Sequence, residues 1–302
     1  MPTGTTAPGE APARRRRPAA ADRAAPYLFI APFLLSFALF FLIPSASSAA
    51  LSLFSYRGYG EPDFVGLRNY ASLLGSPDFR LSVANTVFYW LVPLIPLVVG
   101  GFLLAVLVRS RLTIAPGALR PVYFVPQVMA PVAAALVWRV MFSSDGVVNS
   151  LLPSDVDWLT DPTTGRWSVA ALIVWRGIGW YFVVFLAGLA SVPDETLEAA
   201  TVDGANAWQR LVHVTVPLMR PIFLFAVVID TIQSLQLFTE PNLLLGTGTA
   251  GIAPRAAAPL MNQVVLNIQG GQFGLASAVG WMMFAAIAVV SAIQFRLLRE
   301  RA

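Results

Sequence analysis

The chain has 302 residues, of which 57% are hydrophobic and 12% are charged, and its formal net charge is +4. Soluble domains carry about 25% charged residues, so this composition excludes an ordinary soluble protein and predicts one embedded in a bilayer. The sequence contains no cysteine and one histidine, which excludes disulfides, thiol catalysis and the usual zinc clusters. All 20 cationic side chains are arginine, whereas a P-loop needs a lysine for the nucleotide phosphates. We therefore expect no nucleotide hydrolysis by the P-loop route and no metal site in this chain.

The first 24 residues are rich in Ala, Pro, Thr and Gly and contain four consecutive arginines, Arg14 to Arg17. Such a segment cannot bury an apolar face, and we expect residues 1–24 to be a disordered, basic cytoplasmic tail. The apolar run that follows, residues 27–51, is too long for the core of a signal peptide. It predicts a retained first membrane helix, broken or bent by Pro32 and Pro44, at the start of one transmembrane domain over residues 25–302.

Five further apolar segments are long enough to cross the roughly 30 Å of hydrocarbon in a bilayer. Six membrane helices place both chain ends on one side. If the ends are cytoplasmic, the inner segments carry thirteen arginines and the outer segments five, and this excess of inner cations supports that orientation. The arginines thus mark topology, and we expect membrane lipid and no nucleic acid as a partner. The five segments cover residues 84–108, 122–142, 169–190, 218–238 and 275–297.

A polar segment between the fourth and fifth apolar runs, residues 193–221, has the pattern of two helices joined by a turn. Pro193 precedes a run of helix formers with acidic residues in the first turn, where they complement the helix dipole. Gly204 can adopt a positive φ and close this helix with a tight turn. Helical spacing resumes at Trp208, and Pro217 marks the entry to the next membrane helix.

This segment resembles the EAA loop, the cytoplasmic signature of binding-protein-dependent ABC importer permeases, through Glu198-Ala199-Ala200, Gly204 and the run from Val214 to Pro217. The family pattern ends in Ile-x-Leu-Pro, and Val214 and Val216 here keep side chains that can pack. The resemblance implies an all-α integral membrane protein with six transmembrane helices and the type I importer permease fold. It also implies a coupling helix near residues 199–207 that docks on an ATPase subunit; an ordinary amphipathic interfacial loop is the alternative. The coupling residues would be Glu198, Ala199, Ala200, Asp203, Gly204, Ala205, Trp208 and Pro217, with Trp208 as a buried anchor.

Two outer loops add motifs that resemble the first permease of carbohydrate importers of the maltose and glycerol-3-phosphate type. The resemblance implies three kinds of partner besides lipid: a second, paralogous permease, two cytoplasmic ATPase subunits that bind ATP and Mg, and an extracytoplasmic solute-binding protein. It places the complex in the plasma membrane of a bacterium and assigns no cofactor to this chain itself. The motifs are Asp63 to Tyr70 with Asn85-Thr86, and Asp145-Gly146 with Asn149 and Trp158-Leu159.

Polar side chains inside the predicted membrane helices are candidates for a translocation pathway. At about 100° per residue, one face of the predicted fifth helix is polar, and an intramembrane carboxylate usually faces a cavity or a partner. This face either lines a sugar pathway, since amides and carboxylates hydrogen-bond hydroxyl groups, or forms a polar seam between helices. Candidates on the third and fourth helices either join the lining or belong to an interfacial belt, and an ion pair between Arg176 and Asp230 is compatible with the sequence. The candidates are Asp230, Gln233, Gln236, Glu240, Trp138, Arg176 and Tyr181.

Together these features predict the permease subunit of an ATP-driven importer for a sugar or polyol derivative. The chain would form half of the translocation pathway and couple it to a separate ATPase. An ion-coupled secondary transporter is the alternative, with Asp230 and Glu240 as ion sites, but it leaves the segment 193–221 unexplained.

Overall fold

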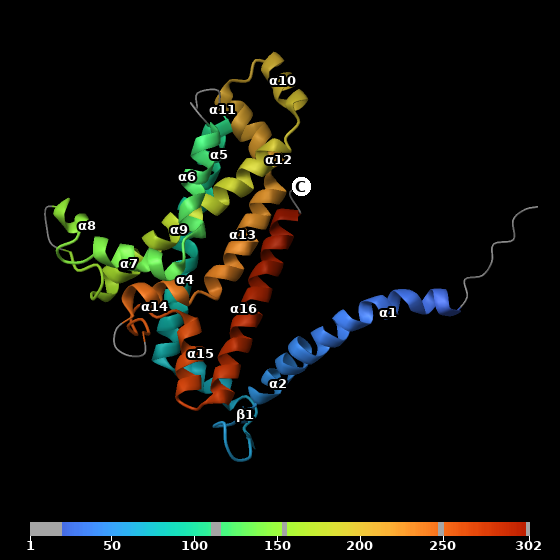
Figure 1. Cartoon of the computed structure of the whole chain (residues 1–302), viewed down its shortest axis with the longest axis vertical. Helices are drawn as coiled ribbons and strands as arrows, with labels where there is room; N and C mark the ends of the chain where they lie inside the picture. Colours follow the sequence, from blue (N-terminus) through green and yellow to red (C-terminus); the bar gives the residue numbers. More distant parts are fainter. Residues whose placement is uncertain (1–19, 110–115, 153–155, 247–250, 300–302) are drawn as a thin grey trace, which may run out of the picture. The chain divides into compact units, whose positions relative to one another are not determined.

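The computed structural model of the chain describes residues 20–109, 116–152, 156–246 and 251–299 (Figure 1). These residues are mostly helical, with a two-stranded antiparallel sheet in which β1 (Phe54–Ser55) pairs with β2 (Asp63–Phe64). The chain divides into two units, Met1–Ser48 and Ala49–Ala302. Residues 1–19 of the tail that we expect to be disordered lie outside the described residues, and the first helix begins at Ala20.

The described residues of the first unit form a mostly apolar helix. It contains α1 (Ala20–Phe37), the π-helical turn η1 (Ala38–Leu42) and most of α2 (Ile43–Leu51). The helix runs through Pro32 without the expected break. Near Pro44 the helix widens instead of breaking: the N–H of Ile43 donates to the carbonyl oxygen of Ala38, five residues earlier, because Pro44 has no N–H to continue the ordinary pattern.

Three unbroken helical spans cross the second unit and coincide with the second, fourth and sixth predicted membrane helices. The first, 33 residues long, joins α4 (Pro77–Ile95), the π-helical turn η2 (Pro96–Gly100) and α5 (Gly101–Arg109). The other two are α9 (Pro162–Ala190) and α16 (Phe273–Arg299).

The third and fifth predicted membrane helices are bent. α6 (Pro116–Val128) meets α7 (Pro131–Met141) at 100°, and the helical segment Ala207–Leu218 meets α13 (Arg220–Leu235) at 66°. Ala130 explains the first bend, because the residue before a proline is disfavoured in the helical region and Ala130 is extended, with ψ of 132°. If each bent pair is one span, the described residues contain six candidate spans, as predicted.

The central helix of the second unit is α9, which packs against both α5 and α6. Gly179 makes the approach of α6 possible, since a Cβ at this position would lie 2.2 Å from the carbonyl oxygen of Tyr123. On the α5 side the core is aromatic: the rings of Phe102 and Phe185 meet edge to face at 5.8 Å, and both side chains are buried. The helices that carry the candidate site are therefore held by close packing.

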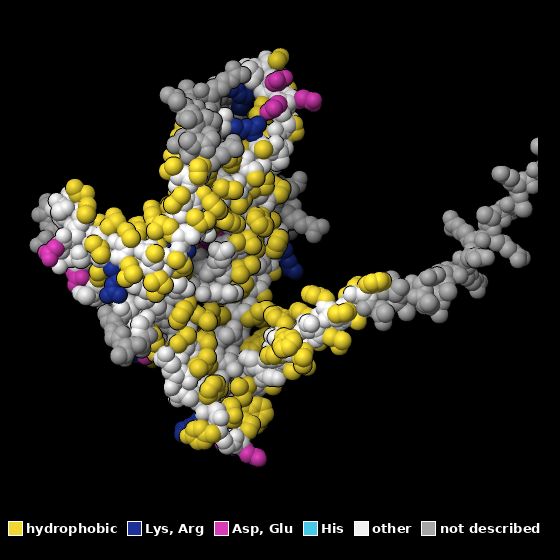
Figure 2. Space-filling view, viewed as in Figure 1, with side chains coloured by type: hydrophobic (Ala, Val, Ile, Leu, Met, Phe, Trp, Pro, Cys, Tyr) yellow, Lys and Arg dark blue, Asp and Glu magenta, His cyan; other side chains and the backbone are white. Residues whose placement is uncertain are grey.

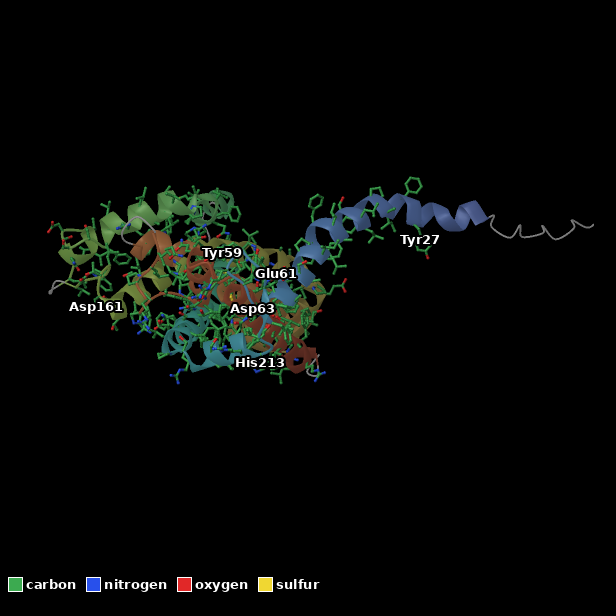
Figure 3. All side chains as sticks on the ribbon, turned by 90° about the horizontal axis from the view of Figure 1, so that it is seen from below. Tyr27, Tyr59, Glu61, Asp63, Asp161 and His213 are labelled. Atoms are coloured by element: carbon green, nitrogen blue, oxygen red, sulfur yellow. The ribbon has the colours of Figure 1, made fainter. Side chains whose placement is uncertain are left out.

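The end of the second unit that carries the β1–β2 hairpin also contains α3 (Arg68–Gly75) and α15 (Leu260–Gln269) (Figure 1). The motif residues Asn85 and Thr86 fasten this end: the Asn85 amide donates to the carbonyl oxygen of Ala258 at 3.1 Å, and the Thr86 hydroxyl accepts from the N–H of Leu260 at 2.7 Å. Figure 3 looks onto the molecule from this end and labels Tyr59, Glu61 and Asp63 near the hairpin.

The surface of the second unit suits a protein that spans a bilayer. In the view of Figure 2, hydrophobic side chains cover its middle, and acidic side chains lie near α10, near the hairpin and around α8 (Val147–Ser150). The helix α10 (Asp194–Val202) lies at the end opposite the hairpin, and α16 runs from the hairpin end toward the α10 end (Figure 1). The predicted inner segment 193–221 and the predicted first outer loop are thus at opposite ends of this unit.

Candidate coupling helix and translocation cavity

The segment after α9 folds as a short helix closed by a glycine turn. Asp194 and Glu195 occupy the first turn of α10, where they complement the helix dipole. At its end Gly204 has a φ of +81°, and two hydrogen bonds define a Schellman cap: the N–H of Ala205 donates to the carbonyl oxygen of Ala200 at 3.0 Å, and the N–H of Gly204 donates to that of Thr201 at 3.1 Å. A non-glycine side chain is disfavoured at this φ.

The second helix of the pair starts immediately after this turn. α11 (Ala207–Arg210) begins with a capping box, in which Asn206 and Gln209 each bond the other's backbone N–H at 2.9 Å. It continues through the π-helical turn η3 (Leu211–Thr215) into α12 (Val216–Leu218). Pro217 lies in α12 and has no N–H to donate to His213, which accounts for the wide turn before it.

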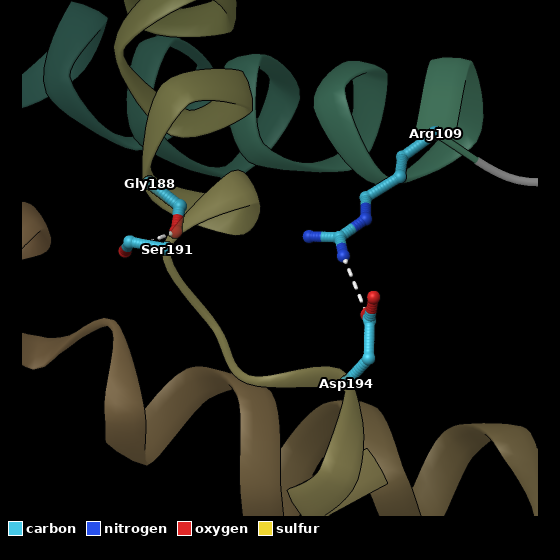
Figure 4. Close-up of polar contacts among 4 residues, drawn as sticks. All are labelled: Arg109, Gly188, Ser191 and Asp194. Carbon is cyan, nitrogen blue, oxygen red and sulfur yellow. Dashed lines mark hydrogen bonds and ion pairs between the residues drawn. The ribbon is translucent and has the colours of Figure 1, made fainter. Parts of the chain in front are cut away.

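One ion pair links α10 to the membrane helices. A guanidinium nitrogen of Arg109, the last residue of α5, lies 3.2 Å from a carboxylate oxygen of Asp194 (Figure 4). Nearby, the Ser191 hydroxyl donates to the carbonyl oxygen of Gly188 at 2.7 Å and stabilises the end of α9. The start of α10 is thereby tied to the end of α5 by an exposed contact, with 81% of the Asp194 side chain accessible.

The rest of α10 is uncovered: within the described part of the chain it has no buried residue. Glu198 and Ala199 are exposed, and Ala200 is half-buried. Trp208 is 67% exposed in this chain, so its burial as an anchor against an ATPase subunit stays a prediction. Glu198 and Trp208 line a hollow of about 920 Å³ between α10, α11 and the ends of α5 and α9.

A second, smaller cavity of about 260 Å³ lies among α6, α9, α13 and the residues that follow α13. It brings together six of the seven predicted pathway residues, and Trp138 is not among its lining residues. Trp138 instead packs against Trp175, with 5.7 Å between ring centroids, and against Phe142. The six are Asp230, Gln233, Gln236, Glu240, Arg176 and Tyr181.

Two of these residues do not lie on the helix that the sequence predicted for them. α13 ends at Leu235, so Gln236 falls in the turn after it, and Glu240 belongs to a separate helix, α14 (Thr239–Leu245). The expected single polar stripe on the fifth helix is therefore wrong. The residues converge nonetheless, because the chain turns back after α13 and presents Glu240 to the same cavity.

The ionisable residues of this cavity form two pairs. The Tyr181 hydroxyl donates to Asp230 at 2.5 Å, and the Ser234 hydroxyl lies 3.4 Å from the other carboxylate oxygen. Arg176 forms an ion pair with Glu240, and both side chains are largely buried. The ion pair between Arg176 and Asp230 considered from the sequence is absent among the described contacts, because α14 brings a different carboxylate to the arginine.

Polar side chains on other elements also line the cavity and were not predicted from the sequence. Gln127 reaches the cavity from α6, while Ser234 and Thr239 flank the end of α13. Gln127 is an isolated amide in an apolar run, and this position could have identified it as a candidate lining residue. Among the residues described, no group of three or more His, Cys, Asp or Glu side chains could hold a metal ion.

Comparison with known proteins gives a consistent family and fold. Residues 97–301 match the family model described as "Binding-protein-dependent transport system inner membrane component". The arabinooligosaccharides transport system permease protein AraP of Bacillus subtilis is 33% identical over 91% of this chain and 88% of its own length. The lactose transport system permease protein LacF of Rhizobium radiobacter is 31% identical over 91% of this chain and 94% of its own length.

A similar fold occurs in a solved structure of a bacterial alginate ABC transporter in complex with an alginate pentasaccharide-bound periplasmic protein. The TM-score is 0.78, and the match covers 93% of this chain and 96% of the other. At 23% identity, this similarity concerns the fold, and it agrees with the predicted all-α type I permease architecture.

Proposed function

Because this chain belongs to the family of inner membrane components of binding-protein-dependent transport systems, we propose that it forms half of the translocation pathway of an ATP-driven sugar or oligosaccharide importer. The chain is a multi-pass membrane permease and not an enzyme. The sugar class is supported by the substrates named for its relatives, arabinooligosaccharides and lactose, and by the amides and carboxylates of the 260 Å³ cavity, which suit hydroxyl groups.

The observation that carries the coupling role is the uncovered helix α10. A short helix that carries no buried residue among those described, capped at its end by Gly204 and tied to α5 through Arg109 and Asp194, is exposed for a partner surface. The partner is a cytoplasmic ATPase subunit, which would hold ATP and Mg. Glu198, Ala199, Ala200, Asp203 and Ala205 would meet it, with the exposed Trp208 anchoring the contact from outside this chain's core.

The complete importer would contain this chain, a second paralogous permease, two ATPase subunits and an external solute-binding protein. The α10 end of the second unit faces the cytoplasm, where the arginine excess also places both chain ends. Closure of the two ATPase subunits on ATP draws the coupling helices together and opens the cavity outward to receive sugar, and hydrolysis resets it. The membrane is the plasma membrane of a bacterium.

Energised uptake in cells that carry the whole transporter tests this proposal. Glu198→Arg should abolish ATP-dependent uptake while the complex still reaches the membrane, because it reverses a charge on the docking face. Glu61→Arg, the same change at an exposed position on the opposite end, is the matched control and should retain uptake. Uptake that survives ATP depletion but collapses with a protonophore would favour the ion-coupled secondary transporter instead.

A further inference from the structure

The charge of the translocation cavity restricts what it can bind. Two of the described arginines lie within the third and fourth predicted membrane helices, Arg139 on α7 and Arg176 on α9. Arg139 is not a lining residue, and its guanidinium approaches the carbonyl oxygen of Gly246 at 3.5 Å. Among the described lining residues, Arg176 is the only cation.

Arg176 is already neutralised by this chain. It forms an ion pair with Glu240, and the side chains of the two residues are only 14% and 18% exposed. Asp230 adds a second carboxylate to the lining, held by the Tyr181 hydroxyl. One cation thus faces two carboxylates, so the lining is negative when Asp230 is ionised and neutral when Asp230 is protonated. In neither state is it positive.

The remaining groups match uncharged hydroxyl groups. Gln127, Gln233 and Gln236 line the cavity with amides, which both donate and accept hydrogen bonds, as a hydroxyl does. The Nε–H of Arg176 is buried and has no acceptor among the described residues. With another nitrogen of the guanidinium on Glu240, Arg176 is engaged within this chain, and the amides are the groups that meet the hydroxyl groups of a substrate.

From this arrangement we infer that the cavity selects neutral polyhydroxyl substrates, such as uncharged saccharides, and rejects anionic ones such as sugar phosphates and uronates. The inference rests on the proposed function and makes Glu240 a specificity-determining residue. An anionic group that entered would lose its hydration beside carboxylates, with no free cation among the described lining residues to replace it. A hydroxyl would exchange water for amide partners.

The test uses the assembled transporter in proteoliposomes with ATP and a probe panel in matched charge classes: lactose, maltotriose and arabinotriose against lactobionate, trigalacturonate and glycerol 3-phosphate. The same probes are measured by equilibrium binding to the detergent-solubilised complex without the binding protein, so that selection by that protein does not decide the result. We expect at least one neutral probe to be imported. Every anionic probe should be imported at least tenfold more slowly and bound at least tenfold more weakly than that neutral probe.

Variants assign the selectivity to the ion pair. Glu240→Gln frees the Arg176 charge, and an anionic probe should then compete with the neutral one at concentrations that leave the wild type unaffected. Arg176→Gln combined with Glu240→Gln removes both charges and should keep the preference for neutral probes. Asp78→Asn breaks the exposed ion pair with Arg255, outside the cavity, and should leave selectivity unchanged.

The experiment separates failure of the charge selectivity from failure of the proposed function. Binding or import of an anionic probe by the wild type within tenfold of the best neutral probe would overturn the inference while leaving the importer intact. Failure of the assembled, membrane-inserted complex to import any probe with ATP would count against the proposed function itself.

Discussion

The side-chain amides of Asn242 and Asn262 exchange two hydrogen bonds, each from Nδ2 of one to Oδ1 of the other at 2.9 Å. Both residues are buried, and Asn242 Oδ1 also accepts from the backbone N–H of Ala253 at 2.7 Å. The pair joins α14 to α15 across a loop. Since α14 carries Glu240, this amide pair helps to set where the carboxylate meets Arg176.

Replacing one member of the pair should destabilise the protein. Asn262→Leu leaves the polar atoms of Asn242 without their partner, and each buried unsatisfied group costs about 1–3 kcal/mol. In a chain of this size, that loss corresponds to a melting temperature lower by about 2–5 °C. Thermal unfolding of the purified complex measures the shift. Gln269→Leu, at an exposed position on the same helix, is the control, and an equal shift in both variants would contradict the role of the amide pair.

The ion pair between Arg109 and Asp194 should contribute little to stability. One partner is 81% exposed, and exposed ion pairs are worth at most about 1 kcal/mol after screening by water and salt. A double-mutant cycle with Arg109→Gln and Asp194→Asn, followed by thermal unfolding, should therefore give a coupling free energy below about 1 kcal/mol. A value several times larger would mean that α10 is held to α5 far more firmly than the geometry indicates.

The turn at Gly204 should tolerate no β-branched residue. At its φ of +81° an L side chain costs about 1–2 kcal/mol, so Gly204→Val should disturb the end of α10 and reduce ATP-dependent uptake by roughly tenfold. Gly204→Asn should be milder, because Asn enters this region more readily. Gly75→Val is the matched control, at a glycine with open space and no positive φ; comparable loss in both would argue against backbone strain as the cause.

The N-terminus of α9 should lose stability in acid. Asp161, labelled in Figure 3, accepts hydrogen bonds from the backbone N–H groups of Thr164 and Thr163 at 3.0 and 2.7 Å. These bonds, Thr164 first, hold the pKa of Asp161 below its usual 3.8. A depressed pKa gives stability that is present above the unfolded-state value and is lost as the pH falls through the folded-state value.

Melting temperatures measured between about pH 5 and pH 3 check that stability falls with the pH. The melting temperature of the wild type should fall more than that of Asp161→Asn over that interval, because the amide caps the helix without titrating. Asp145→Asn, in the same outer loop, should follow the wild type. If Asp161→Asn shows the same pH dependence as the wild type, the cap is not the titrating group.

Local features made much of the architecture predictable. Six apolar segments follow from length and hydrophobicity alone, since a chain that must cross a bilayer has to satisfy its backbone within each segment. The turn at Gly204 was equally accessible, because a positive φ is a property of single residues that glycine adopts without strain. Asp230, Gln233, Arg176 and Tyr181 could be named as pathway candidates from their position inside apolar helices, with an interfacial belt as the alternative for Arg176 and Tyr181.

Other features depended on where helices end and how the chain returns. The polar stripe predicted through Glu240 assumed one continuous helix, but α13 ends at Leu235, so the helical period no longer relates Glu240 to Asp230. Arg176 consequently pairs with a carboxylate 64 residues away that only the position of α14 brings near. The exposure of Trp208 likewise depends on how α11 packs against the rest of the chain. Sequence thus determined which residues could enter the membrane and turn, whereas tertiary structure decided which charges meet, because ion pairing depends on distance in space rather than along the chain.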